Sequence, residues 1–299
     1  MKNHHPIQIK SEKVAIWFVA PALIVTSAVI LIPFLYNLVI SFSDMNLVTF
    51  YRWNMIGFTN YSDILFDSGF WYLLFKTVLW TGLNLFVLVS GGIFLAVLLN
   101  QKIPGSIFFK ILFILPWVVP QYLTALVWKG IFNYESGSVN TFLLKLNLDP
   151  VMWLGSEWGS FWATLVTNVW LSLPFMIVVV LAGLQTIPKN LYEAAELDGA
   201  GFWFMFRRIT LPLLKPVLIP AIILSGIWTF NNLNVIWLVT DGGFPSDQSH
   251  ILVSWVYKAG LSSFRIGYAA AYGIIIMLVL LFFSWQYIKK SKTLETIFE

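Results

Sequence analysis

The chain has 299 residues, of which 59% are hydrophobic, 11% are charged and none is cysteine. Soluble domains are about 45–50% apolar and about 25% charged, so this composition argues against a soluble enzyme, a disordered chain and a nucleic-acid-binding module. The lack of cysteine excludes disulfides and cysteine-ligated metal sites.

Six long stretches without Asp, Glu, Lys or Arg follow one another along the chain. They are residues 14–40, 77–99, 111–128, 158–187, 216–240 and 266–288. A helix needs about 20 apolar residues to cross the hydrocarbon core of a membrane, and each stretch meets or nearly meets that length. We therefore predict an all-α, polytopic membrane protein with six transmembrane helices. The first stretch is longer than the core of a signal peptide, so we expect it to remain as an anchor.

The positive charges are distributed unevenly about these six spans. If both termini are cytoplasmic, the inner segments hold twelve of the 18 Lys and Arg residues, as the positive-inside rule requires. The expected order is a cytoplasmic N-terminal tail over 1–13, a six-helix transmembrane domain over 14–288 and a cytoplasmic C-terminal tail over 289–299. The longest inner connection is 188–215.

The six stretches hold no ionisable side chain at depth. Proton-coupled transporters usually keep such groups as relays, so their absence argues against proton-driven transport and favours an uncharged solute. The sequence also has no P-loop, HExxH or GxSxG motif, and we predict no catalytic residue and no metal ligand. Any energy for transport is expected to enter through a partner.

The inner connection begins with the features of a short amphipathic helix. Thr186 can cap its start, Pro188 is tolerated in a first turn, and Gly199 suits its C-terminal end. Such a helix would lie at the inner membrane surface. Its role is either to contact another protein or only to anchor the loop at the interface.

The fifth stretch carries neutral polar side chains. Ser225, Thr229 and Asn232 are spaced four and three apart, so they share one face of a helix, and Trp228 borders that face. Amides and hydroxyls beside an indole ring suit a sugar, because they bond its hydroxyls while the ring stacks on its apolar face. The alternative is hydrogen bonding between membrane helices.

Several spaced motifs in this half of the chain resemble one family. They are Glu193-Ala-Ala195, Asp198-Gly-Ala200, Leu211-Pro212, Pro216, Asn168-Val-Trp170, Leu173-Pro-Phe175, Phe230-Asn-Asn232 and Thr240-Asp-Gly-Gly243. Together they resemble the EAA-loop permease subunits of bacterial binding-protein-dependent ABC sugar importers. Within that family they look more like the maltose or maltodextrin branch than the glycerol-phosphate branch.

The resemblance implies a type I ABC importer permease fold, in which the chain transports but is not an enzyme. In this family a short cytoplasmic helix docks on the ATP-hydrolysing subunits. The implied ATPase-coupling residues are Glu193, Ala194, Ala195, Asp198, Gly199 and Ala200.

The resemblance also implies a substrate site, with a break of the fourth span near Pro174. The implied substrate-binding residues are Leu171, Ser172, Phe175, Ser225, Trp228, Thr229 and Asn232. Maltose or maltodextrin, trehalose, another oligosaccharide and a monosaccharide all remain open as the sugar.

The implied partners are a second permease subunit, two ATP-binding cassette subunits and an extracytoplasmic sugar-binding protein. ATP and Mg would bind the cassette subunits, with no cofactor on this chain. The location would be the bacterial inner membrane, crossed several times, with no nucleic acid as partner. Two alternatives stay open, namely an ABC permease for an amino acid, polyamine or phosphate, and a stand-alone carrier or channel.

Overall fold

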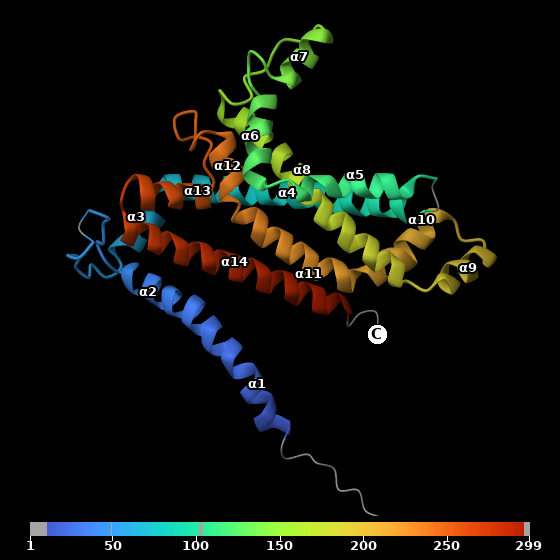
Figure 1. Cartoon of the computed structure of the whole chain (residues 1–299), viewed down its shortest axis with the longest axis horizontal. Helices are drawn as coiled ribbons and strands as arrows, with labels where there is room; N and C mark the ends of the chain where they lie inside the picture. The colour runs from blue at the N-terminus through green and yellow to red at the C-terminus, as the bar shows by residue number, and fades with distance from the viewer. Residues whose placement is uncertain (1–10, 49, 102–103, 296–299) are drawn as a thin grey trace, which may run out of the picture. The chain divides into compact units, whose positions relative to one another are not determined.

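The computed structural model describes residues 11–48, 50–101 and 104–295 (Figure 1). Within these ranges the regular structure is helical, apart from one isolated bridge between Ser43 and Met55. The all-α prediction is therefore confirmed. Residue contacts divide the chain into two compact units. The first unit is the chain up to Phe66 with Ala259–Ile275, and the second is Asp67–Lys258 with the chain from Ile276 onward.

The first unit begins with one long apolar helix. The helical segments of this unit are α1 (Ser11–Thr26), a π-helical turn (Ser27–Leu31), α2 (Ile32–Ile40), α3 (Thr59–Phe66), most of a second π-helical turn (Lys258–Ser262) and the first part of α14 (Ile266–Glu295). The continuous helix over Trp17–Ile40 is long and apolar enough to cross a membrane. Asn60 holds the following loop, because its Nδ2 donates to the carbonyl oxygens of Ser41 (3.0 Å) and Ser43 (2.8 Å).

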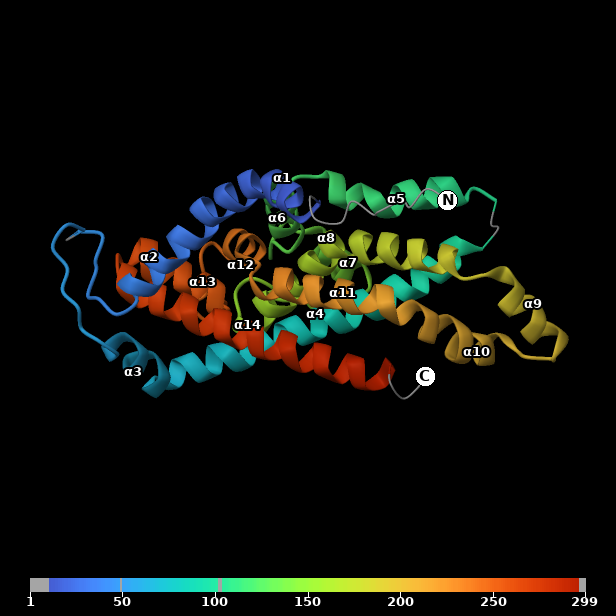
Figure 2. The ribbon, with the colours of Figure 1, turned by 90° about the horizontal axis from the view of Figure 1, so that it is seen from below.

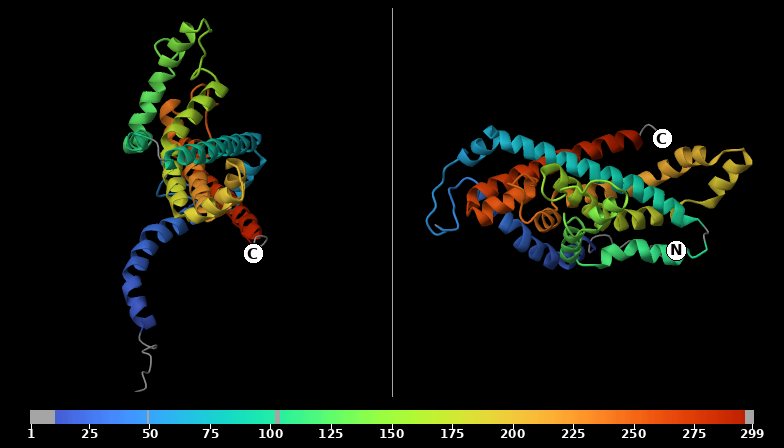
Figure 3. Two further views of the ribbon diagram at one scale, coloured as in Figure 1. Left: turned by 90° about the vertical axis from the view of Figure 1, so that its right-hand side faces the viewer. Right: turned by 90° about the horizontal axis from the view of Figure 1, so that it is seen from above.

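The second unit contains the other helices, which range from one turn to 33 residues. They are α4 (Ser68–Asn100), α5 (Ser106–Val118), α6 (Gln121–Ile131), α7 (Ser138–Lys145), α8 (Glu157–Thr186), α9 (Lys189–Leu197), α10 (Phe202–Met205), a π-helical turn (Phe206–Thr210), α11 (Leu211–Phe230), α12 (Leu233–Val239), α13 (Leu252–Tyr257) and the rest of α14. Within this unit α9 and α10 lie at the opposite end from α13 (Figure 2). Helix α7 stands out from α4 and α11, beyond α6 (Figure 3).

Caps and small residues explain how α4 and α8 form and pack. The Asp67 carboxylate accepts from the backbone N–H of Gly69 at the start of α4, and the Ser156 hydroxyl accepts from Gly159 at the start of α8. The two helices approach closely at Gly92, where a Cβ atom would overlap Met176. The core beside this contact is apolar and includes Val180.

The six predicted spans correspond to helices, with two changes of shape. Among the described residues, five helices or runs of successive helices are long and apolar enough to cross a membrane, and α5 with α6 makes a sixth only as a pair bent by 98°. The predicted helix over 111–128 is therefore present as two helices, one ending at Val118 and the next beginning at Gln121. The predicted span over 216–240 is also interrupted, because α11 ends at Phe230 and α12 begins at Leu233. The last helix continues to Glu295, past the predicted end at 288.

The loop between α12 and α13 packs closely against a buried histidine. Asp241, Gly242 and Gly243 all have positive φ, and a Cβ atom on Gly243 would overlap the imidazole of His250. Burial lowers the pKa of His250 to about 4, so the ring is neutral near pH 7. Lys76 on α4 donates to the carbonyl oxygen of Gln248 and so ties the loop to that helix.

Candidate functional site

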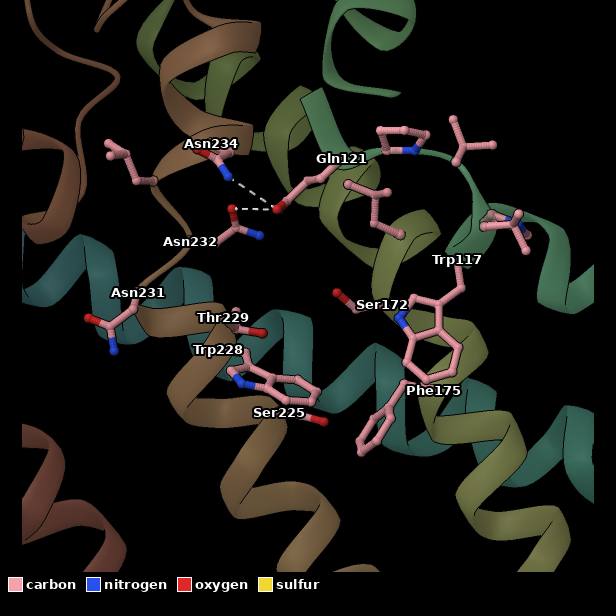
Figure 4. Close-up of a pocket in the computed structure, with 16 residues that line it drawn as sticks. Trp117, Gln121, Ser172, Phe175, Ser225, Trp228, Thr229, Asn231, Asn232 and Asn234 are labelled. Carbon is pink, nitrogen blue, oxygen red and sulfur yellow. Dashed lines mark hydrogen bonds between the residues drawn. The ribbon is translucent and has the colours of Figure 1, made fainter. Parts of the chain in front are cut away.

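A pocket of about 550 Å³ lies in the second unit where several helices bend or end (Figure 4). Its walls come from the α5–α6 bend, the middle of α8, the end of α11 and the α11–α12 connection. The lining residues are Pro116, Trp117, Val118, Val119, Pro120, Gln121, Leu171, Ser172, Phe175, Ser225, Trp228, Thr229, Asn231, Asn232, Leu233 and Asn234. None of these side chains carries a charge, so the pocket offers no counter-ion to a charged ligand.

The bend between α5 and α6 follows from the residues at its corner. Val119 precedes a proline, and this disfavours the helical conformation. It is accordingly extended, with φ −77° and ψ 129°. Pro120 has no backbone N–H to continue the ladder of helical bonds. The chain therefore turns here, and α6 starts afresh at Gln121 beside the pocket.

The α11–α12 connection is built from two asparagines. Asn231 ends α11 with its N–H on the carbonyl oxygen of Ile227, and Asn232 caps α12, with its Oδ1 accepting from the N–H of Val235 (3.2 Å). The expectation that Asn232 shares one helix face with Ser225 is therefore wrong. Asn232 instead lines the pocket from the break between the two helices. The break forms here because the Asn232 side chain bonds a backbone N–H group and so favours the start of a new helix over the continuation of α11.

The structure brings together all seven substrate-binding residues that the family resemblance implies. They line this one pocket: Leu171, Ser172, Phe175, Ser225, Trp228, Thr229 and Asn232. Their role in binding stays a prediction. The expected break near Pro174 is wrong, since α8 continues through that residue to Thr186.

Four other polar or aromatic residues of the pocket are not among those expected from the sequence, namely Trp117, Gln121, Asn231 and Asn234. Gln121 bridges the two chain breaks, because its Nε2 donates to Oδ1 of Asn232 (3.0 Å) and its Oε1 accepts from Nδ2 of Asn234 (3.3 Å) (Figure 4). The sequence does hold a sign of its role, because an amide directly after Pro120 is unusual in an otherwise apolar membrane span.

Three aromatic rings stand in a row on one side of the pocket, away from these amides (Figure 4). The ring centroids of Trp117 and Phe175 are 6.1 Å apart, and those of Phe175 and Trp228 are 5.2 Å apart, both edge to face. Trp228 is 52% exposed, so much of its ring is open to a ligand. Flat apolar faces opposite amide groups suit a molecule that has both apolar faces and hydroxyls.

Three hydroxyls in the pocket are also available to a ligand. In the described part of the chain, the side chains of Ser172, Ser225 and Thr229 make no hydrogen bond within the protein. Hydroxyls can both donate and accept, so they match the hydroxyls of a neutral ligand without fixing its direction. Among the described residues, no group of three or more His, Asp or Glu could hold a metal ion.

The predicted coupling segment is a short projecting helix. Glu193, Ala194 and Ala195 lie on α9, whose residues are all at least partly exposed, and Leu197 is 90% exposed. The helix is tied back at one point, where the Tyr192 hydroxyl and Thr210 Oγ1 are 2.9 Å apart.

The segment leaves α9 through a glycine-dependent turn. Asp198 ends the helix, and the N–H groups of Gly199 and Ala200 reach back to the carbonyl oxygens of Glu196 (3.0 Å) and Ala195 (2.9 Å). This is a Schellman turn, which needs a left-handed residue, and Gly199 has φ +78°. The start of α9 differs from the prediction, because Thr186 ends α8 and the helix begins at Lys189.

The sequence matches a family described as "Binding-protein-dependent transport system inner membrane component" over residues 88–288. The chain belongs to this family. The resemblance to permease subunits of ABC importers is thereby confirmed, and the chain is a multi-pass inner-membrane transport component.

Two relatives and one solved structure agree with this assignment. A probable ABC transporter permease protein of Brucella suis biovar 1 is 34% identical over 286 residues, covering 93% of this chain and 96% of the relative. The trehalose/maltose transport system permease protein MalF of Thermococcus litoralis is 35% identical over 237 residues, covering 79% and 80%. A bacterial alginate ABC transporter, solved in complex with alginate pentasaccharide-bound periplasmic protein, has a chain of the same fold. Its TM-score is 0.81 at 22% identity, covering 96% of both chains.

Proposed function

We propose that this permease carries a neutral sugar across the inner membrane, with maltose, maltodextrin or a related oligosaccharide such as trehalose as its substrate. The observation that carries the proposal is the pocket, which combines exposed aromatic rings with amides and hydroxyls and has no charged residue. The naming of one relative as a trehalose/maltose permease supports the same solute class.

The absence of charge from the pocket walls sets the proposed solute apart from an ionic one. A charged amino acid, polyamine or phosphate would lose its hydration here without gaining an ion pair, and this is costly in a low-dielectric site. A neutral sugar loses only hydrogen bonds to water, which the amides and hydroxyls replace.

We propose that a second permease subunit completes the pathway and that two ATP-binding cassette subunits, which hold ATP and Mg, power it. The projecting helix α9 is the proposed docking element, since all its residues are at least partly exposed and its small Ala194 and Ala195 allow close approach. A sugar-loaded periplasmic protein would deliver the solute, as the alginate transporter's complex with such a protein supports.

Alternating access is the proposed mechanism. The pocket lies at two chain breaks, Val119–Pro120 and Asn231–Asn232, so small rotations at these points would change which side of the pocket is open. Helix α9 would pass the movement of the ATPases to α8 and α11, between which it lies in the chain. Both termini would be cytoplasmic, as the distribution of Lys and Arg favours.

The proposal is tested by ATP hydrolysis of the assembled complex with its binding protein and a panel of solutes. Maltose, trehalose and a galacto-oligosaccharide should stimulate hydrolysis, while a charged amino acid and phosphate should not. Stimulation by a charged solute alone would contradict the proposal. Uptake by the isolated chain in liposomes, without ATPase or binding protein, would instead support a stand-alone carrier.

A further inference from the structure

Five side-chain amides form a continuous hydrogen-bonded series, here called the amide chain, from the pocket to the middle of α4. Each amide donates to the oxygen of the next one inward. From the pocket inward the bonds are Asn234 Nδ2 to Gln121 Oε1 (3.3 Å), Gln121 Nε2 to Asn232 Oδ1 (3.0 Å), Asn232 Nδ2 to Asn168 Oδ1 (2.7 Å) and Asn168 Nδ2 to Asn84 Oδ1 (2.8 Å). The amide chain therefore connects α12, α6, the α11–α12 connection, α8 and α4.

Backbone groups fix the direction of the amide chain at two independent points. Nδ2 of Asn84 donates to the carbonyl oxygen of Trp80 (2.8 Å), and a carbonyl oxygen can only accept. Nearer the pocket, Oδ1 of Asn232 accepts from the backbone N–H of Val235, which can only donate. Both anchors require the same orientation, so reversing one amide would break the bonds on either side of it.

The inner two amides are sealed from the pocket. Asn84 and Asn168 are both 0% exposed, and neither lines the pocket wall. A buried amide without a partner is costly, and linked hydrogen bonds strengthen one another. Asn84 therefore reaches the pocket only through Asn168.

The fixed direction decides what the outer amides offer to a ligand. Gln121 uses one of its two N–H donors on Asn232, so the other is left for a ligand. Asn234 donates to Gln121, and its Oδ1 makes no hydrogen bond within the described part of the chain. A reversed amide chain would exchange these donors and acceptors and present a different pattern to the hydroxyls of a solute.

We propose that Asn84 is a positioning residue for the transported solute. Through Asn168 it holds the amides of Asn232 and Gln121 in one orientation, and it thereby sets the hydrogen-bond pattern of a pocket from which it is itself excluded. The inference rests on the proposed function, in which this pocket is the sugar site. Hydrogen exchange without solute tests the positioning role of Asn84, and uptake kinetics test the role of the pocket in transport.

Hydrogen exchange at Val235 tests the positioning without any solute. In the assembled complex in lipid nanodiscs, Asn84→Ala should raise exchange of the peptide that contains Val235 about fivefold, as loss of one hydrogen bond would. Ser90→Ala is the matched control, since Ser90 also bonds the carbonyl oxygen four residues earlier on α4 (Oγ to Phe86, 2.6 Å) but lies outside the amide chain. It should leave Val235 unchanged.

A conservative variant distinguishes orientation from packing. The buried carboxyl group of Asn84→Asp is expected to take up a proton and so to keep one donor and one acceptor. This variant should restore most of the protection at Val235, whereas Asn84→Ala should not. If Asn84→Ala fails to assemble, Asn84→Ser takes its place in the same comparison.

Uptake kinetics test the consequence for transport, with the panel sugar that the wild-type complex moves fastest. Asn84→Ala should raise KM about fivefold with little change in kcat. In an Asn232→Ala background the same change should add nothing, because Asn84 acts through Asn232.

Two results would overturn the inference. One is unchanged exchange at Val235 in Asn84→Ala, and the other is independent, multiplying effects of the Asn84 and Asn232 changes on KM. Raised exchange at Val235, together with a wild-type complex that moves no sugar of the panel, would support the positioning role and reject the proposed function.

Discussion

Different residues of the pocket offer the two kinds of contact that a neutral sugar requires. Trp228 and Trp117 offer ring faces, whereas Gln121 and Asn232 offer fixed amides (Figure 4). The rings would stack on any flat apolar face, so we expect them to supply affinity with little selectivity. The amides require partners at defined positions, so we expect them to supply selectivity.

Replacing Asn232 separates its two roles, as cap of α12 and as member of the amide chain. Asn232→Ala removes both roles and should lower uptake about tenfold or more while the complex still assembles, since the loss of the cap and of the two hydrogen bonds to Gln121 and Asn168 costs about 1–3 kcal/mol. Asn232→Ser keeps the cap alone and should recover stability but not uptake. Wild-type uptake kinetics for purified complex with Asn232→Ala would show that this residue is only structural.

Protonation of His250 should weaken the fold as pH falls. The unfolded chain takes up a proton here from about pH 6.5 downward, whereas burial keeps the folded ring neutral until about pH 4. Stability is therefore unaffected above about pH 6.5 and declines by up to about 3 kcal/mol between these two values. Asp247 stays ionised through this window, since Lys258 beside it lowers the pKa of its carboxyl group.

The measurement for His250 is the thermal unfolding midpoint of the complex in detergent at pH 7.5 and pH 5. The wild type should unfold at a lower temperature at pH 5. His250→Gln should lose much of that difference, because the amide does not titrate in this range. An equal drop in both proteins would assign the pH effect to other groups.

The turn after helix α9 depends on the left-handed conformation of Gly199, so we expect substitutions there to disturb how α9 is held. Gly199→Val should uncouple ATP hydrolysis from uptake, because a branched residue at φ +78° costs about 1–2 kcal/mol and disturbs the turn. Glu193→Lys should have the same effect through the docking surface. Gly201→Ala is the matched control, since Gly201 has φ −77° and open space around it. Normal uptake by either test variant, at normal expression, would contradict the coupling role.

Prolines alone do not predict where the helices of this chain break. Helices α8 and α11 continue through Pro174, Pro216 and Pro220. The chain bends at Pro120, and it also breaks at Asn231–Asn232 without a proline. A proline removes one hydrogen bond, which a packed helix can tolerate, whereas a capping amide starts a new helix. The sequence pattern therefore locates these helices better than their interruptions.

Most helices of the whole chain could be predicted, because a charge-free stretch of about 20 residues can satisfy its backbone hydrogen bonds in a membrane by forming a helix. The boundaries were less accurate where charges are buried. Helix α4 starts at Ser68, before the predicted 77, because the charge-free stretch stops at Lys76, although this residue is 1% exposed and pairs with Glu157 (2.9 Å) inside the fold. Pairing of this kind depends on residues far apart in the chain, so charge counting could not detect it.

Part of the candidate site could also be predicted from the sequence. Seven of its residues belong to two stretches in which spacing and family motifs point to one place. Gln121 and Asn84 come from other stretches, and only the three-dimensional structure joins them to Asn232 and Asn168. Local patterns indicate which faces are polar, but they do not show which amides bond to one another.

The orientation of the chain gives a whole-molecule prediction that its composition makes easy to test. The chain has no cysteine, so single cysteines can be introduced without a background signal. Glu135→Cys should react with a membrane-impermeant maleimide from outside intact cells, whereas Asn190→Cys should react only after the membrane is opened. The reverse pattern would place the termini outside and contradict cytoplasmic docking of α9.

Direct observation of the solute would show whether the uncharged pocket holds a neutral sugar during transport. The measurement is a cryo-electron microscopy structure of the assembled complex, stalled with the panel sugar that most strongly stimulates ATP hydrolysis. We expect sugar density between the Trp228 ring and the amides of Gln121 and Asn232. Sugar density elsewhere along the pathway, with this pocket empty, would contradict this expectation.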